Sequence, residues 1–187
     1  FADFVTCGFN QIVNVAAKFF YRFERPCPMV VRLPSGGAVG AGAFHSQNPE
    51  SWFAHVAGLK VVCPATAADA KGLLKSAIRD PNPVLFCEHK FLYRRVKEKL
   101  PPGELLVPLG KARVARAGRD LTIVAWGAQV WTALDAAEVV DALFTVGTLA
   151  HGISAAARSA GLTDATHCET KAEALDRFFV DMAPSST

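Results

Sequence analysis

The sequence predicts an α/β protein built on a parallel sheet with helices on its faces. Short apolar runs at residues 29–33, 60–64 and 84–88 have the length and composition of buried strands. A helical pattern over residues 66–79 lies between the second and third runs, and Asp80-Pro-Asn-Pro ends it. Because strand, helix and strand follow one another at this spacing, we expect a right-handed parallel crossover.

The first predicted element is a helix over residues 9–23. Its apolar residues recur at intervals of three and four, which is the spacing of one helical face. The residues on that face are Phe9, Ile12, Val13, Ala16, Phe19, Phe20 and Phe23. We therefore expect this whole face to pack against the core.

A glycine loop follows the first predicted strand, which should stop at Pro34. The loop contains Gly36, Gly37, Gly40 and Gly42, and His45 stands at its exit. Open α/β sheets bind ligands at such strand-to-loop positions, and glycine lets the backbone approach a bulky group closely. The loop lacks the lysine of a Walker loop, and no acidic residue follows at the spacing of a dinucleotide site.

The next elements alternate in the same way. A short helix over residues 50–56 should turn Trp52 and Phe53 inward. Thr66 and Asp69 form a capping pattern at the start of the helix that precedes the third strand. The residues of that helix expected to face the sheet are Ala70, Leu73, Leu74 and Ala77.

The second half of the chain begins with a connector. Residues 91–107 have no periodicity and contain Pro101-Pro102-Gly103, which is typical of an interdomain link. Residues 111–115 and 121–125 are then predicted as strands of a second α/β unit, followed by a helix over residues 128–140. The tail repeats the alternation once, with a second capping pattern at Thr170 and Glu173.

Composition narrows the class of protein. The chain has 187 residues, of which 51% are hydrophobic and 20% are charged, as in an ordinary globular protein. Its net charge of +3 and its dispersed basic residues do not favour nucleic-acid binding. The five cysteines show no C-x-x-C pair, so they are interpreted as reduced, mostly buried thiols. No apolar run reaches the length of a membrane span.

Several longer motifs occur in one order along residues 1–140. They are FADF and GFNQIVNVAAK at the start, then HSQ-PE-FAH-GLKVV-P, DAKGLL-AIRD-NPV and E-K-LYR. In this order and spacing they resemble the beta subunit of the thiamine diphosphate-dependent 2-oxo acid dehydrogenases of the pyruvate and branched-chain type. The resemblance implies an incomplete transketolase-type pyrimidine-binding sheet over residues 1–90. The connector and the start of a transketolase-C-terminal-like domain at residues 108–140 would follow it.

The resemblance also implies an activity, cofactors and partners. The activity is oxidative decarboxylation of a 2-oxo acid, with transfer of the acyl group to lipoamide. The cofactor is thiamine diphosphate with magnesium, shared with an alpha subunit. A second beta subunit and the lipoyl domain of the transacylase are the other expected partners. The expected location is the cytoplasm of a bacterium, or the mitochondrial matrix of a eukaryote.

Two departures from the family pattern affect these expectations. The chain begins at Phe1, so the family's preceding segment, with its cofactor-activating glutamate, is absent from this sequence. The chain alone is therefore expected to be inactive. Residues 141–187 leave the pattern, and their FTVG and KAEAL segments instead resemble the last domain of the ligase that adds D-alanyl-D-alanine to the muramoyl tripeptide. A non-catalytic truncated or fused chain and another transketolase-like thiamine enzyme are the alternative interpretations.

His45 is the candidate catalytic residue. An imidazole titrates near neutral pH, so a histidine at the exit of a glycine loop can exchange a proton with an alkoxide, a carboxylate or a thiolate. The resemblance implies that it faces the thiamine ring and helps to orient the 2-oxo acid and transfer the acyl group. A histidine that only hydrogen-bonds the loop is the alternative.

A potassium site is also implied by the resemblance. In many family members this ion is held by backbone carbonyls from the strand before the glycine loop and from the AIRD-NPV turn. The corresponding residues here are Cys27, Met29, Val30, Ala77, Asp80 and Asn82. A simple helix stop without an ion is the alternative, while His151, His167 and Cys168 lack the spacing of a metal site.

Overall fold

The computed structural model describes residues 1–118, 122–137, 143–146 and 165–168 of the chain. The chain folds into two compact units. The first comprises Phe1–Arg113 and Ala125–Trp131, and the second comprises Val114–Val124 and Thr132–Thr187. The candidate site lies in the first unit.

A parallel three-stranded sheet is the centre of the first unit. Its strands are β1 (Val30–Ser35), β2 (Lys60–Val62) and β3 (Val84–His89), in the order β1-β3-β2. Both pairs are parallel, with Leu33 opposite Cys87 and Val62 opposite Phe86. The prediction of a parallel α/β sheet is therefore confirmed, and the three strands lie where the apolar runs placed them.

Strand β1 continues beyond the predicted stop at Pro34. It includes Pro34 and ends at Ser35, where the register reaches His89. A proline removes a ladder hydrogen bond from a central strand, but an edge strand tolerates it. Because β1 is an edge strand in the described sheet, the stop expected at Pro34 was wrong.

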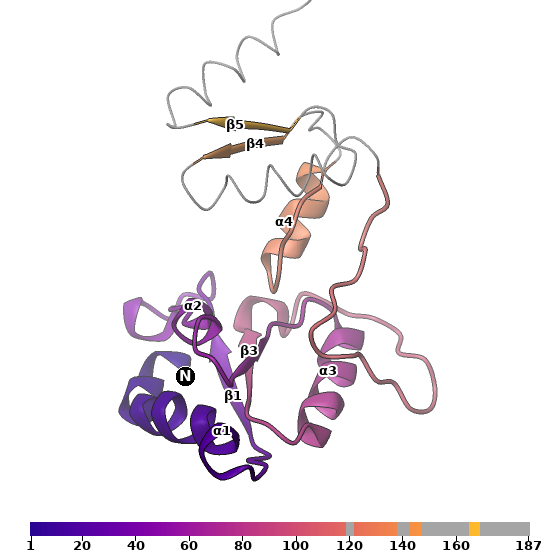
Figure 1. Cartoon of the computed structure of the whole chain (residues 1–187). Coiled ribbons are helices and arrows are strands. Elements are labelled where there is room, and N and C mark those ends of the chain that lie inside the picture. Colours follow the sequence, from indigo (N-terminus) through magenta and orange to yellow (C-terminus); the bar gives the residue numbers. More distant parts are fainter. Residues whose placement is uncertain (119–121, 138–142, 147–164, 169–187) are drawn as a thin grey trace, which may run out of the picture. The chain divides into compact units, whose positions relative to one another are not determined.

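Helices cover both faces of this sheet (Figure 1). Side chains alternate along β3, so Leu85 and Cys87 point to one face while Val84 and Phe86 point to the other. The first pair packs with the N-terminal helical run and α2 (Glu50–Ala54), and the second with α3 (Ala67–Arg79). This two-sided burial explains why β3 is apolar along most of its length.

The N-terminal helical run is less regular than predicted. It consists of a 3₁₀ segment (Ala2–Gly8), a π segment (Gln11–Val15), a second 3₁₀ segment (Ala16–Lys18) and α1 (Phe19–Phe23). Ile12 and Ala16 are buried as expected, but Phe20 and Phe23 are 56% and 52% exposed. Because 3₁₀ and π turns change the rotation per residue, a face at 3.6-residue spacing does not continue through them.

Helix α2 buries only one of its two aromatic residues. Phe53 is fully buried, whereas Trp52 is 37% exposed. Consecutive residues of a helix point about 100° apart, so two neighbours rarely face the same core. The prediction was therefore right for Phe53 and wrong for Trp52.

Helix α3 begins at the capping box that the sequence predicted. The Asp69 N–H donates to Thr66 Oγ1 at 3.0 Å, and the Thr66 N–H donates to Asp69 Oδ2 at 3.2 Å. Leu73, Leu74 and Ala77 pack on the sheet, as expected.

We expect Thr66→Ala to lower the free energy of unfolding by about 1 kcal/mol, because an N-cap hydroxyl contributes about that much. Urea unfolding followed by circular dichroism measures the change. Ser76→Ala in the same helix is the matched control, since Ser76 takes no part in the cap. Equal effects of the two changes would show that the cap does not stabilise this helix.

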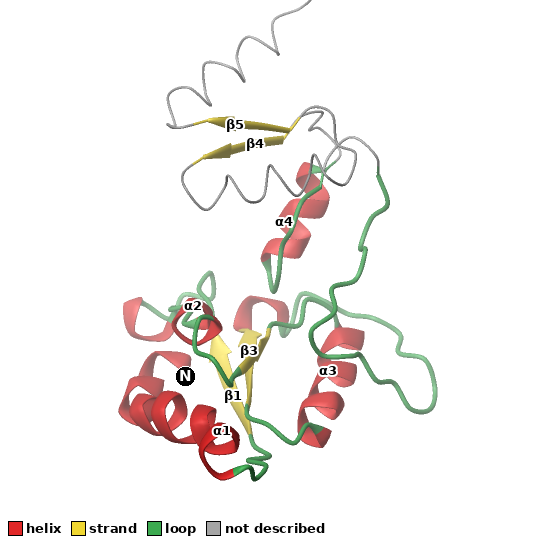
Figure 2. Cartoon of the chain, viewed as in Figure 1, coloured by secondary structure: helices red, strands yellow, loops and turns green. Residues whose placement is uncertain are grey.

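Residues 91–118 and 122–128, which include the predicted connector, contain no strand (Figure 2). The strand predicted at residues 111–115 is absent, and residues 122–125, the described part of the other one, are also not a strand. Val114 is 79% exposed and Val124 is 73% exposed. β-propensity reflects packing on a sheet, and it does not maintain a strand without a neighbour.

The described part of the remaining chain contains a helix and a pair of strands. Helix α4 (Gln129–Ala136) lies within the predicted helix, and β4 (Leu143–Val146) pairs in parallel with β5 (Ala165–Cys168). The capping pattern at Thr170 and the residues 151 and 173 lie outside the described residues. Within the part of the chain that is described, no helix has the length and apolarity needed to cross a membrane.

Candidate functional site

The glycine loop leaves the carboxyl end of β1 and is fixed where it starts and where it returns. The Gly36 N–H donates to the Gln47 carbonyl at 3.0 Å. Asp3 Oδ1 accepts the N–H groups of Ser46 and Gln47 at 3.1 and 3.0 Å. Ser46 Oγ also donates to the Gly42 carbonyl at 2.6 Å. The two residues after His45 therefore hold the loop, and Asp3 is the acceptor that joins the loop to the N-terminal run.

Gly36 is required at its position. Its φ of +81° favours glycine, and a Cβ there would lie 2.2 Å from His89 Nε2. The loop therefore starts in direct contact with the imidazole at the end of β3. Gly36 and His89 are therefore neighbours in the candidate site.

His45 lies on a short 3₁₀ turn (Ala43–His45) at the loop exit. Its half-buried ring meets the phenyl ring of Phe1 edge-on at 4.2 Å between centroids, and that of Phe4 at 5.7 Å. These contacts restrain the imidazole without a described hydrogen bond to its nitrogens.

Three buried polar atoms near the loop lack hydrogen-bond partners among the described residues. They are Asp3 Oδ2, His89 Nδ1 and Lys90 Nζ. Lys90 Nζ lies 5.3 Å from the centre of the Phe1 ring. Buried polar atoms are nearly always paired, so this cluster indicates a place where a polar group of a ligand or a partner chain completes the structure.

The charges in this cluster influence one another. Burial acts to raise the pKa of Asp3, but the N–H groups of Gln47, Asp3 and Ser46 and the charge of Lys90 outweigh it, so this pKa lies below its ordinary value. Burial, and then the neighbouring Lys90 charge, lowers the pKa of His89. Burial also lowers the pKa of Lys90, against the opposing effect of Asp3. The site thus holds a carboxylate and a neutral imidazole at neutral pH.

The sequence did not single out Asp3, His89 or Lys90 as site residues. The available signal for Asp3 was a carboxylate between apolar residues in FADF, because a charge in an apolar run is buried only when it is paired. His89 is the last residue of β3 and Lys90 follows it, so both lie at the carboxyl end of a strand, which is the ligand-binding end of a parallel sheet.

An ion pair lies on the opposite face of β3. Arg32 donates to the Glu88 carboxylate through Nε at 2.5 Å and Nη2 at 2.9 Å, and the Tyr93 hydroxyl donates to Glu88 Oε2 at 2.7 Å. Burial acts to raise the pKa of Glu88, but these hydrogen bonds and the Arg32 charge lower it below its ordinary value. Burial and the hydrogen bond to Glu88 raise the pKa of Tyr93.

We expect Arg32→Met to lower the free energy of unfolding at pH 7 by about 2 kcal/mol, because it removes both guanidinium donors and leaves the buried Glu88 carboxylate with the Tyr93 hydroxyl alone. The Arg32 side chain is 60% exposed, which keeps the value below that of a fully buried pair. Guanidinium unfolding at several pH values measures the change.

The stability that Glu88 contributes depends on pH with a definite sign. The folded pKa of Glu88 is lowered, so the stability it contributes is present above the ordinary value of 4.5 and is lost as pH falls through the folded pKa. The wild type and Arg32→Met should therefore converge in stability below pH 4.5. Arg79→Met removes an ion pair that is exposed on both sides and should change stability little at any pH. A constant gap between wild type and Arg32→Met down to low pH would contradict the assignment.

The segments of the predicted potassium site lie next to one another. The Cys27 N–H donates to the Pro81 carbonyl at 2.9 Å, and the Val84 N–H donates to the Met29 carbonyl at 3.0 Å. Asp80 Oδ1 accepts the Asn82 N–H, while Asp80 Oδ2 contacts Lys60 Nζ at 2.5 Å. The Ala77 carbonyl accepts the Asp80 N–H at 3.2 Å. The segment from Cys27 to Met29 therefore lies beside the turn at residues 80–84, where Lys60 forms an ion pair with Asp80.

Comparison with known proteins gives the class of protein. Residues 1–96, which include the sheet, the glycine loop and His45, match the family model of the transketolase pyrimidine-binding domain. The chain belongs to this family. Within it, the chain is similar to beta subunits of 2-oxo acid dehydrogenases, as the sequence motifs indicated.

Three relatives illustrate the similarity. The 2-oxoisovalerate dehydrogenase subunit beta of Bacillus subtilis (strain 168) is 50% identical over 143 residues, which are 75% of this chain and 44% of the relative. The mitochondrial pyruvate dehydrogenase E1 component subunit beta of Caenorhabditis elegans is 45% identical over 151 residues, 75% of this chain and 43% of the relative. The beta subunit of the acetoin:2,6-dichlorophenolindophenol oxidoreductase of Cupriavidus necator is 48% identical over 139 residues, 73% of this chain and 41% of the relative.

The alignments cover most of this chain but less than half of each relative. The chain spans about two fifths of the length of the relatives it matches. The similarity covers about three quarters of the chain, as expected from the motifs. The relatives include bacterial and mitochondrial proteins.

Proposed function

We propose that the first unit contributes the pyrimidine-binding domain to a thiamine diphosphate-dependent 2-oxo acid dehydrogenase, as part of a beta-type subunit. The observation that carries this proposal is the family match over residues 1–96, which contains the fixed glycine loop and His45. The reaction is oxidative decarboxylation of a 2-oxo acid and transfer of the acyl group to lipoamide. In this proposal the chain acts together with an alpha subunit.

The residues of the first unit suit a heterocyclic ring of the cofactor better than they suit its diphosphate. Neutral and acidic polar atoms, with one buried ammonium, line the loop, and they suit the contact with a heterocyclic ring. Only Lys90 among them carries the positive charge that a diphosphate requires. The diphosphate and magnesium therefore belong to the alpha subunit in this proposal, and the bound cofactor supplies the electron sink for decarboxylation.

The chain's own residues have three tasks in this proposal. Asp3 fixes the loop through two backbone N–H groups, so that His45 is presented in one position. His45 exchanges a proton with the substrate or the acyl acceptor. The exposed aromatic side chains Phe1, Phe4 and Phe44 surround this position and become covered when an alpha subunit or a second beta subunit binds.

The remaining expectations belong to the same proposal. The potassium ion is held by the turn that includes Ala77, Asp80 and Asn82, together with the segment from Cys27 to Val30. The lipoyl domain of the transacylase receives the acyl group. Residues 91–107 link the domain to the unit that begins near residue 108, and the cell compartment is the cytoplasm or the mitochondrial matrix.

A segment exchange tests the proposal. Residues 1–96 replace the corresponding segment of the Bacillus subtilis subunit beta, and the hybrid is produced with that organism's alpha subunit. Carbon dioxide release from 2-oxoisovalerate and from pyruvate is measured, with acyl transfer to a lipoyl domain. Activity on either acid supports the proposal. A hybrid that assembles but decarboxylates neither acid contradicts it, and oxidation of acetoin alone would favour the function named for the Cupriavidus relative.

A further inference from the structure

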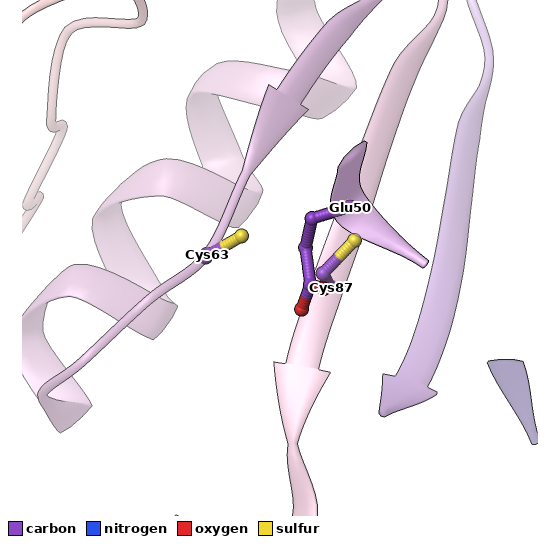
Figure 3. A group of neighbouring side chains, drawn as sticks. All are labelled: Glu50, Cys63 and Cys87. Atoms are coloured by element: carbon purple, nitrogen blue, oxygen red, sulfur yellow. The ribbon is translucent and has the colours of Figure 1, made fainter. Parts of the chain in front are cut away.

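Two thiols and a carboxylate meet on the face of the sheet that carries the N-terminal run (Figure 3). They belong to Glu50 at the start of α2, Cys63 directly after β2, and Cys87 in β3. One ligand atom of each lies within 4.8 Å of the others. The β2–β3 register pairs Val62 with Phe86, and its continuation places Cys63 beside Cys87.

The donor set selects a kind of metal ion. Thiolates favour soft or borderline cations, and two cysteines with one carboxylate are typical ligands of Zn²⁺. Three protein ligands leave a fourth tetrahedral position for water or an added group. Calcium and magnesium, which prefer oxygen ligands throughout, do not fit this set.

The spacing is close to what such an ion needs. With Zn–S bonds of about 2.3 Å, two sulfurs of a tetrahedral site lie about 3.8 Å apart. The observed limit of 4.8 Å exceeds this by an amount that small side-chain rotations remove. Ser35 Oγ also donates to Glu50 Oε1 at 3.4 Å, which gives the carboxylate an outer partner of the kind that orients metal ligands.

We propose that Glu50, Cys63 and Cys87 form a binding site for Zn²⁺ with one position open to solvent or a ligand. The site is linked to the start of the glycine loop through Ser35, which precedes Gly36 and donates a hydrogen bond to Glu50. It is separate from the potassium turn. It does not depend on the activity proposed above.

Cobalt binding tests the site in the full chain. The 187-residue protein is reduced with a phosphine and dialysed against Co²⁺, whose thiolate charge-transfer absorption reports cysteine ligands. We expect a single ion per chain, displaced by Zn²⁺. Cys63→Ser should weaken binding by more than about 100-fold, since even an outer partner of a metal site is worth 10–100-fold. Glu50→Gln should also weaken binding, because the carboxylate charge is lost.

The controls separate this site from the other cysteines. Cys7→Ser, at an exposed position, and Cys168→Ser, in β5, should leave Co²⁺ binding unchanged. If Cys87→Ala prevents folding, as judged by circular dichroism, the half-buried Cys63 and Glu50 decide the result. Absence of Co²⁺ binding by the wild type, or equal binding by all variants, would overturn the proposal. A linked Cys63–Cys87 peptide after peroxide treatment, with no metal uptake by the reduced chain, would also overturn it.

Discussion

Gly58→Ala is expected to lower the free energy of unfolding by about 3 kcal/mol, the sum of a left-handed backbone penalty and an overpacking penalty. Gly58 has a φ of +96°, which a residue with a Cβ adopts only with strain. A Cβ built there lies 1.8 Å from the Ala17 carbonyl oxygen and 2.8 Å from its carbon. Because these are backbone atoms, no side-chain rotation can relieve the collision.

Gly103→Ala is the matched control for this prediction. Gly103 has a φ of +84°, but nothing lies within 4 Å of its added Cβ. The two variants share the backbone penalty, so the difference between them measures the collision with Ala17. Urea unfolding followed by tryptophan fluorescence and by circular dichroism gives both values. Equal losses in the two variants would show that the N-terminal run moves away without cost.

The junction at Gly58 matters for the site as well as for stability. Lys18 Nζ donates to the Ala57 carbonyl at 2.5 Å, so the same turn is joined twice to the N-terminal run. That run carries Asp3, which holds the glycine loop. The N-terminal run therefore contacts both the turn at Gly58 and the loop that ends at His45.

The sequence predicted elements whose signals are local. Strand β3 is buried on both faces, so its apolar run appears without interruption, and α3 has a capping box at one end and prolines beyond the other. These features depend on residues within one element or at its ends, and the sequence contains all of that information.

Other features depended on parts of the chain that are distant in the sequence. Asp3 acts on Ser46 and Gln47, more than forty residues away, and no periodicity indicates such a contact. The meeting of Cys63 with Cys87 required the β2–β3 register. The prediction of a strand at residues 111–115 was wrong because local propensity alone does not form a strand. The β-forming residues are present there, but no described strand pairs with them.

His45→Ala is expected to lower kcat for acyl transfer by about 100-fold or more in the hybrid enzyme, because a positioned acid or base contributes at least that factor. The ring of His45 is set by the edges of Phe1 and Phe4, and its loop is fixed by Asp3. Stopped assays with a lipoyl domain measure acyl transfer, and carbon dioxide release is measured separately. This prediction rests on the proposed function and fails with it.

His45→Phe separates chemistry from packing. A phenyl ring can keep the edge contacts with Phe1 and Phe4 but cannot exchange a proton, so it should be as inactive as alanine. His55→Ala removes an exposed histidine ten residues later and should retain full activity. If His45→Phe were active while His45→Ala was not, the imidazole would serve only to hold the loop. In that case His89 and Lys90, the other polar residues of the cluster, would be the groups to test for proton transfer.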